Sequence, residues 1–202
     1  MRRMIFSMLE QLPLRQRNRL ATMRLTQAAA VTQMEVHGFD NTTIEMVAQI
    51  SGVSVSTIYR QFRTKENLIL WDEQDSAIDA ELARRLPREP IVNAFRDAMI
   101  ATLVDRTDQN LFLRRLKLVY SVPSIWAAAA EQDRIARRDL AAAIAATNGR
   151  SQATTTDTVI AATCLAALDV ALDSWQDDDG HERLDVLITQ ALSAAVSLGL
   201  TD

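Results

Sequence analysis

The stretch Thr42–Leu68 constrains the fold more than any other part of this 202-residue chain, because it contains several helix starts in close succession. Thr42 and Glu45 have the spacing of a capping box, in which the threonine hydroxyl accepts one backbone amide and the glutamate carboxylate accepts another. Gly52 tolerates the left-handed backbone that commonly ends a helix. Ser54 can then cap a second helix. Two short helices joined by a turn that contains glycine form a helix-turn-helix, and this stretch therefore predicts one.

The second of these helices has one apolar side and a small, hydroxylated first turn. Its apolar residues recur at helical spacing and are Val55, Ile58, Tyr59 and Phe62. In a helix-turn-helix the second helix enters the major groove of DNA, N-terminal end first. Between Glu45 and Glu66 the sequence has no acidic residue, whereas it has Arg60, Arg63 and Lys65. A surface that meets phosphate excludes carboxylates in this way, so the stretch predicts a DNA-binding surface.

A longer set of residues resembles the tetracycline-repressor (TetR) family of transcriptional regulators. The matching positions are Gly38-Phe39, Thr42-Thr43, Val47-Ala48, Gly52-Val53-Ser54, Thr57-Ile58-Tyr59, Phe62 and Lys65-Glu66-Asn67-Leu68. The resemblance implies an all-α fold of about nine helices. It has an N-terminal three-helix head that carries the helix-turn-helix, followed by a helical body that binds a ligand and dimerises.

The same resemblance implies which residues of the head touch DNA. The implied contacts are Thr43, Ser54, Tyr59 and Lys65 with phosphates, and Val55, Ser56, Arg60 and Gln61 with bases, with Thr57 in the same helical turn. Arg60 could pair with a guanine and Gln61 with an adenine, because those pairings are bidentate.

The charge of the chain is divided unevenly along its length. The net charge is −4, but residues 1–65 hold nine basic and four acidic residues, whereas residues 66–202 hold thirteen and twenty-two. A basic head on an acidic body suits a small DNA-binding domain joined to a body that does not touch DNA. We therefore expect a DNA-binding domain over residues 1–66 and a ligand-binding and dimerisation domain over residues 67–202.

Helical spacing predicts the remaining elements. The first long helix should cover residues 14–37, with Gln27 and Met34 on its buried side. Thr64 can cap a fourth helix, unbroken over residues 65–86, which ends before Pro87. Five body helices are expected, over residues 91–106, 109–120, 123–147, 156–176 and 182–198. Residues 1–14 are either a basic arm for the minor groove or a simple tail, and their role stays open.

Composition excludes several classes of protein. Five glycines and four prolines are too few for a turn-rich β-fold. The sequence has no run of about 18 apolar residues, so we expect no membrane span. The single cysteine, Cys164, fits a reducing compartment, and we expect a cytoplasmic protein.

Three further features could carry chemistry, and a structural interpretation is favoured for each. The acidic stretch Asp177–Glu182 lacks calcium-loop spacing and is interpreted as a solvated turn. His37 ends a helix, where a basic side chain interacts favourably with the helix dipole, and the sequence offers it no catalytic partner. Cys164 lies on an apolar stripe and is interpreted as a buried, inert thiol. We expect no catalytic residue, metal or cofactor.

The body carries more large apolar residues than a linker needs, which favours a pocket for an apolar or amphipathic small molecule. Its expected walls are Phe95, Met99, Phe112, Leu116, Tyr120, Trp126, Leu168 and Trp175. The pattern Arg114-Arg115 followed by Leu118, Val119 and Pro123 faintly resembles a subgroup of the family that binds acyl-CoA-like ligands, whose phosphates Arg114 or Arg115 could meet.

The function expected from these features is a homodimeric repressor, released by its ligand from an inverted-repeat operator in double-stranded DNA. The last two helices should form the dimer as a four-helix bundle, since Ala162, Ala166, Ala191, Ala194 and Ala195 permit close approach. The alternatives are a small all-α enzyme and a protein-interaction module that retains the helix-turn-helix fold.

Overall fold

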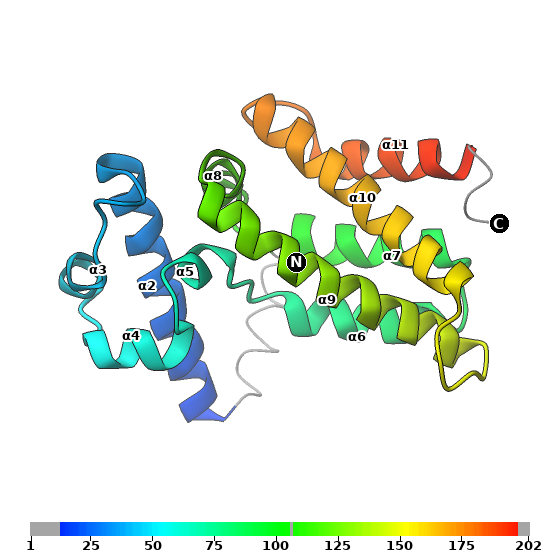
Figure 1. Ribbon diagram of the computed structural model, residues 1–202, viewed down its shortest axis with the longest axis horizontal. Helices are drawn as coiled ribbons and strands as arrows, with labels where there is room; N and C mark the ends of the chain where they lie inside the picture. The colour runs from blue at the N-terminus through cyan, green and yellow to red at the C-terminus, as the bar shows by residue number, and fades with distance from the viewer. Residues whose placement is uncertain (1–12, 106, 198–202) are drawn as a thin grey trace. The chain divides into compact units, whose positions relative to one another are not determined.

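The computed structural model describes residues 13–105 and 107–197, and every regular element in those ranges is helical (Figure 1). The α-helices are α2 (Leu14–His37), α3 (Ile44–Ser51), α4 (Val55–Phe62), α5 (Glu66–Leu70), α6 (Asp75–Arg85), α7 (Ile91–Met99), α8 (Gln109–Ser121), α9 (Pro123–Thr147), α10 (Thr155–Asp177) and α11 (Leu184–Ser197). A short π-helix, η1 (Ile100–Val104), follows α7. The all-α prediction is confirmed. The predicted basic arm lies outside the described residues up to residue 12.

The described residues form two compact units. The head unit contains the described part of residues 1–73 together with residues 118–126, and the body unit contains residues 74–117 and the described residues from 127 onward. The chain therefore passes between the units three times, twice within the helices α8 and α9. The predicted domain boundary after residue 66 stays a prediction.

The head unit is built around α2, on which α3 and α5 pack, while α4 packs on α3 (Figure 1). The buried side of α2 includes Met23, Gln27, Ala30, Val31 and Met34, as helical spacing predicts. The helix-turn-helix contributes Ile44, Val47, Ile58 and Phe62 to the same core. These burials fix α4 by its apolar side and leave its polar side exposed.

The predicted fourth helix over residues 65–86 is wrong, because the chain breaks it into α5 and α6. Trp71 leaves the helical conformation with φ −57° and ψ 125°. The buried Gln27 side-chain amide donates to the carbonyls of Leu68 at 3.0 Å and Trp71 at 2.7 Å, which a continuous helix would use for its own amides. The ring of Trp71 also meets Phe62 edge-on at 6.0 Å. A glutamine on another helix thus ends α5, and nothing in the local sequence announces it.

The predicted capping box at Thr42 is also wrong by one residue. Thr43 is the N-cap of α3, and its hydroxyl accepts from the amide of Met46 at 3.2 Å. Thr42 is buried and donates its hydroxyl to the carbonyl of Gly38 at 2.8 Å. The Thr-Thr pair offers two possible caps, and burial of the first selects the second. Gly52 ends α3 in the left-handed conformation, as predicted, with φ 69° and ψ 12°.

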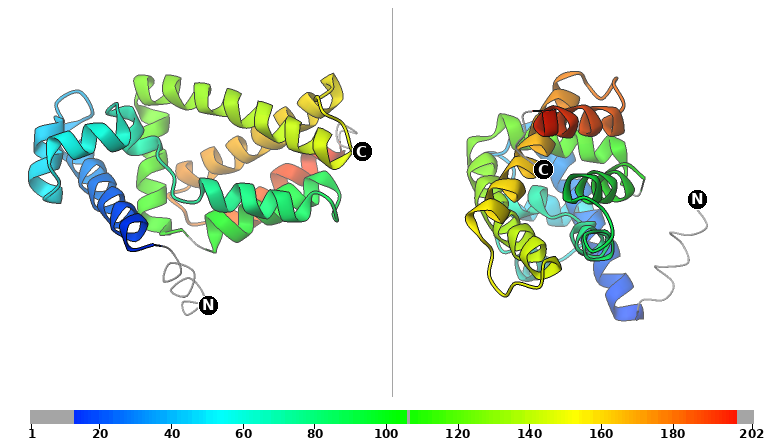
Figure 2. Two further views of the ribbon diagram at one scale, coloured as in Figure 1. Left: turned by 90° about the horizontal axis from the view of Figure 1, so that it is seen from below. Right: turned by 90° about the vertical axis from the view of Figure 1, so that its right-hand side faces the viewer.

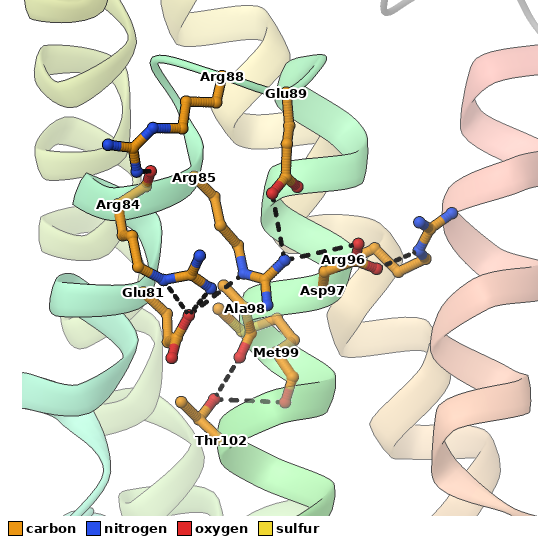
Figure 3. A network of polar contacts seen from close by, with 10 residues as sticks. All are labelled: Glu81, Arg84, Arg85, Arg88, Glu89, Arg96, Asp97, Ala98, Met99 and Thr102. Atoms are coloured by element: carbon orange, nitrogen blue, oxygen red, sulfur yellow. Dashed lines mark hydrogen bonds and ion pairs between the residues drawn. The ribbon is translucent and has the colours of Figure 1, made fainter.

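In the body unit, α6 and α7 are joined by a network of charged side chains centred on Arg85 (Figure 3). Its guanidinium group lies 3.2 Å from Glu81, 3.3 Å from Glu89 and 3.7 Å from Asp97. The Glu81 carboxylate also pairs with Arg84, chiefly through a hydrogen bond, and this holds the pKa of Glu81 below its ordinary value. Because these acids and bases neutralise one another, the network joins two helices and offers little net charge.

The predicted helix over residues 91–106 changes type in its second half. The amide of Asp105 bonds to the carbonyl of Ile100 at 3.2 Å, a five-residue step that defines η1 as a π-helix. The buried Thr102 hydroxyl donates to the carbonyl of Ala98 at 2.7 Å (Figure 3), and such bonds bend helices. The spacing of apolar residues cannot distinguish one π-turn from a continuing α-helix.

The last two helices, α10 and α11, lie side by side (Figure 2). By length and composition α10 could cross a membrane, and one third of its most apolar stretch is buried within the monomer. Its outward side carries Val159, Ala166 and Val170, with Val170 59% exposed. On α11, Val186 and Val196 are also exposed. An apolar surface of this kind commonly meets a protein or a membrane.

Candidate nucleic-acid interface

The first turn of α4 is a cluster of hydroxyl groups held in place by its own cap. Ser54 accepts from the amide of Thr57 at 3.3 Å and donates to the Thr57 hydroxyl at 2.9 Å. The Ser54 and Ser56 hydroxyls lie 3.3 Å apart, and a guanidinium nitrogen of Arg60 lies 3.4 Å from the Thr57 hydroxyl. A helix N-terminus with small hydroxylated side chains can approach phosphate closely.

The side of α4 that faces away from the core of the head unit carries the residues predicted to contact DNA. Ser54, Ser56, Tyr59 and Arg60 are exposed, with Tyr59 51% exposed. Val55, Thr57 and Gln61 are partly exposed, and Thr43 is exposed at the start of α3. The fold therefore brings the predicted residues of α4 onto one short helix whose apolar side is fixed in the head.

Gln61 differs from the other predicted base readers. Its side-chain oxygen is buried and has no hydrogen-bond partner within the described residues. A bidentate contact with adenine needs both the amide oxygen and the amide nitrogen, so Gln61 must rotate before it can make that pairing. The Nε atom of Arg17, on α2, is likewise buried and has no hydrogen-bond partner within the described residues.

Lys65 is held by the backbone of the turn that precedes α3. Its ammonium group donates to the carbonyls of Phe39 at 2.6 Å and Thr42 at 3.1 Å, with the carbonyl of Asp40 at 3.5 Å. The same nitrogen lies 4.1 Å from the centre of the Phe39 ring. Since an ammonium group has three donors, at most one is left for a phosphate. The family resemblance identifies Lys65, but it cannot show that backbone carbonyls of the head unit occupy its ammonium group.

Arg63 is one of the three basic residues in the acid-free stretch, and neither its sequence position nor the family resemblance implies a role for it. Arg63 is exposed and lies between α4 and α5, with φ 66° and ψ −49°. Only one other residue apart from glycine, Asp179, has positive φ in the described chain. The nearest signal in the sequence was the acid-free window that contains Arg63, which says nothing of its backbone.

The predicted ligand-binding residues are divided between the two units. Six of them belong to the body unit: Phe95, Met99, Phe112, Leu116, Leu168 and Trp175. All of these but Leu168 are buried, and the Phe112 and Trp175 rings lie 5.7 Å apart. Tyr120 and Trp126 belong to the head unit, where their rings lie 5.2 Å apart and Trp126 is 45% exposed. The pocket formed by these eight residues stays a prediction.

Arg115 is the buried member of the predicted arginine pair. It lies in the body unit with its guanidinium carbon 5.9 Å from the centre of the Phe112 ring. Arg114 is partly exposed. The predicted acyl-CoA contact of this pair stays a prediction.

The features interpreted as structural have ordinary surroundings. Cys164 is fully buried, and burial raises the pKa of its thiol to about 12. In the acidic turn, Asp179 pairs with Lys117, chiefly through a hydrogen bond that lowers the pKa of that carboxyl. Within the described residues, no three His, Cys, Asp or Glu side chains gather so that they could hold a metal ion.

Comparison with known proteins gives matches over both parts of the chain. Residues 28–70 match the sequence model of bacterial regulatory proteins of the tetR family. Residues 89–198, more than half of the chain, match the model of the MftR C-terminal domain. No curated protein is similar enough in sequence to count as a match.

Two solved structures are similar in fold. One is titled as a complex of SmeT with triclosan; it is 17% identical, with a TM-score of 0.62 over 88% of this chain and 91% of that one. The other is a putative transcriptional regulator from Pseudomonas aeruginosa PAO1, which is 20% identical, with a TM-score of 0.51 over 95% and 94%. At these identities the likeness concerns the fold alone.

Proposed function

Because the chain belongs to the TetR family of bacterial transcriptional regulators, we propose that it is a homodimeric repressor that a small molecule releases from operator DNA. The DNA-binding part of this proposal rests on the structure of the short helix α4. Its Ile58 and Phe62 side chains are buried, its first turn is hydroxylated, and the chain around it has no acidic residue from 46 to 65. A protein of this kind works inside the cytoplasm, where its DNA is.

The proposed contacts with DNA follow the exposed side of α4. Ser54, together with Thr43 and Tyr59, meets phosphates, and Ser56 and Arg60 reach base edges, with Val55 and Thr57 beside them. Lys65 contributes through the ammonium hydrogen that its two close carbonyl partners leave. Gln61 contributes after its side chain rotates out of the head.

The proposed dimer uses the outward side of α10 and α11. The exposed valines there, with Ala166 between Val159 and Val170, form an apolar surface that a second copy would cover as a four-helix bundle. This accounts for the apolar character of α10 without a membrane. Light scattering at micromolar concentration should give twice the monomer mass, and a monomer would contradict this part of the proposal.

The DNA-binding half is tested by selection from a random duplex library, followed by footprinting. A two-fold dimer with one reading helix per subunit should select an inverted repeat, with half-sites about one helical turn apart or a multiple of it. Arg60→Ala should relax the preference at one base position and cost about 1–3 kcal/mol. Recovery of sequences without two-fold symmetry would contradict the proposed dimer on DNA.

The ligand half rests on the buried aromatic and apolar side chains of the body unit. A similar fold was solved with triclosan, which supports a small-molecule ligand here. Thermal shift with long-chain acyl-CoAs, fatty acids and flat aromatic compounds should find one that raises the melting temperature and releases the selected DNA. At about 100 times its dissociation constant a ligand stabilises the folded protein by about 2.7 kcal/mol.

A matched pair of variants separates the two halves of the proposal. Phe112→Ser should abolish the response to the ligand while the selected duplex still binds, since Phe112 lies in the body unit. Arg60→Ala should weaken DNA binding while the ligand still stabilises the protein. If ligand binding survives in Phe112→Ser, or no compound releases DNA from the parent protein, the ligand half of the proposal fails.

A further inference from the structure

We propose that Arg63, which the fold holds in a strained turn directly after the recognition helix, is the principal phosphate-binding cation at the C-terminal end of α4. The inference rests on the proposed DNA-binding function and adds a residue that neither the sequence pattern nor the family resemblance assigned. It also gives Lys65 a positioning role, since that lysine fixes the turn before α3.

The first observation is the backbone of Arg63. Its φ of 66° and ψ of −49° place it at the centre of a classic γ-turn, in which the Thr64 amide bonds to the Phe62 carbonyl at 2.8 Å. This turn is rare and strained for any residue with a side chain. Glycine would adopt the same backbone at lower cost.

The second observation is that the neighbours of Arg63 impose this conformation. The Phe62 side chain is buried, and its carbonyl accepts a second hydrogen bond from the Asn67 side-chain amide at 2.9 Å. The Asn67 backbone amide in turn bonds to the Thr64 hydroxyl at 3.3 Å, and the Arg63 amide bonds to the Tyr59 carbonyl at 3.0 Å. None of these contacts uses the arginine side chain.

The third observation is the state of the guanidinium group. The Arg63 side chain is exposed and makes no hydrogen bond or ion pair with any described residue. The Lys65 ammonium group, two residues away, is committed to the carbonyls of Phe39 and Thr42. An arginine that occupies a position suited to glycine, and whose side chain makes no polar contact with the described residues, is explained by a partner outside the chain. In an acid-free stretch next to a DNA-reading helix, that partner is a phosphate, which guanidinium binds well.

The test measures stability and DNA binding in the same variants of the full-length protein. The probe is a DNA duplex of about 30 base pairs, roughly three helical turns. Its sequence is arbitrary, because a contact with phosphate does not depend on the base sequence. Affinity is measured over a range of salt concentrations, and the melting temperature is measured without DNA.

Arg63→Gly should change the two quantities in opposite directions. It relieves the strained turn, so the melting temperature should rise by about 2–4 °C. It removes one phosphate contact per subunit, so the slope of log affinity against log salt should become shallower by about 0.9 per subunit. Affinity at low salt should fall at least about tenfold, as expected for a lost hydrogen bond to a charged group. Arg63→Lys should keep most of the slope.

The control is Arg138→Gln, which removes the same charge from an exposed position on α9 in the body unit. It should leave the salt slope unchanged. If Arg63→Gly keeps the parent slope, the inference about Arg63 is overturned while the proposed function stands. If the parent protein binds no duplex at any salt concentration, the proposed function fails and Arg63 loses its role with it.

Discussion

Replacing Gln27 by leucine tests the physical account of the break between α5 and α6. Gln27 is 3% exposed, and its amide donates to the carbonyls of Leu68 and Trp71, with that of Ile69 at 3.4 Å. Leucine has a similar volume but no donor, so Gln27→Leu removes hydrogen bonds and keeps most of the packing.

The expected cost follows from the two close hydrogen bonds. The Leu68 carbonyl is buried and the Trp71 carbonyl is partly buried. A buried carbonyl left without its partner costs about 1–3 kcal/mol and a lost ordinary hydrogen bond about 1 kcal/mol, so the variant should lose roughly 2–4 kcal/mol of stability. For a chain of this size each kcal/mol lowers the melting temperature by about 2–4 °C. We therefore expect a fall of roughly 4–16 °C, measured by circular dichroism or differential scanning fluorimetry.

Two further variants make the result specific to the amide donor. Gln16→Leu makes the same change at an exposed position on the same helix and should leave the melting temperature nearly unchanged. Gln27→Glu keeps the shape but directs a carboxylate at the carbonyls, so it should be less stable than Gln27→Leu at neutral pH. That deficit should shrink in acid, because a protonated carboxyl can donate. If Gln27→Leu has the same melting temperature as Gln16→Leu, or gains helix content without losing stability, then Gln27 does not cause the break between α5 and α6.

Three other predictions each rest on one residue and its contacts or burial. Lys65→Met should lower the melting temperature by several degrees, because the Phe39 and Thr42 carbonyls lose their donor, and it should reduce the salt slope less than Arg63→Gly does; a larger slope change than in Arg63→Gly would contradict this. The Asp157 carboxylate pairs with Arg150 and accepts hydrogen bonds from the backbone amide and the hydroxyl of Thr154, and these contacts hold its pKa far below the ordinary value. The resulting stabilisation is present above about pH 4 and is lost as pH falls toward the depressed pKa, so thermal melts of Asp157→Asn should lie below the parent at pH 7 and approach it in strong acid; equal melting temperatures at pH 7 would refute it. Cys164 should resist a thiol reagent in the native protein at pH 8 and react after denaturation, because burial raises its pKa to about 12; rapid native labelling would show that the helix opens.

The sequence predicted best those features that depend on local pattern. The helices around Gly52 and Ser54 have caps and apolar spacing that are visible in the residues themselves. Both helices form, although the N-cap of α3 is Thr43 and not the predicted Thr42. Pro123 begins α9 as its fixed φ and missing amide suggest. Family membership, carried by the run from Gly38 to Leu68, is confirmed by the matching sequence models.

The failures arose where a distant side chain decides the backbone. The break after Leu70 depends on Gln27, forty-one residues earlier than Leu68, and propensity alone favours a continuous helix. The γ-turn at Arg63 depends on Asn67 and buried Phe62, and nothing in an arginine suggests positive φ. In the candidate site, the family resemblance identified Lys65 as a DNA contact. It could not show that the Phe39 and Thr42 carbonyls accept hydrogen bonds from its ammonium group, because those contacts form only in the folded head.

The division of the chain into units has a consequence for how the head can be made. Residues 118–126, which include the buried Leu118 and Ile125, belong to the head unit although forty-four residues of the body precede them. A fragment that ends at residue 73 therefore lacks part of the unit to which it belongs. During synthesis the head cannot finish packing until residue 126 has left the ribosome, and closing so long a loop slows folding. The DNA-binding unit is therefore not contiguous in sequence, and we expect a fragment that ends at residue 73 to unfold at a lower temperature than the same unit does in the full-length protein.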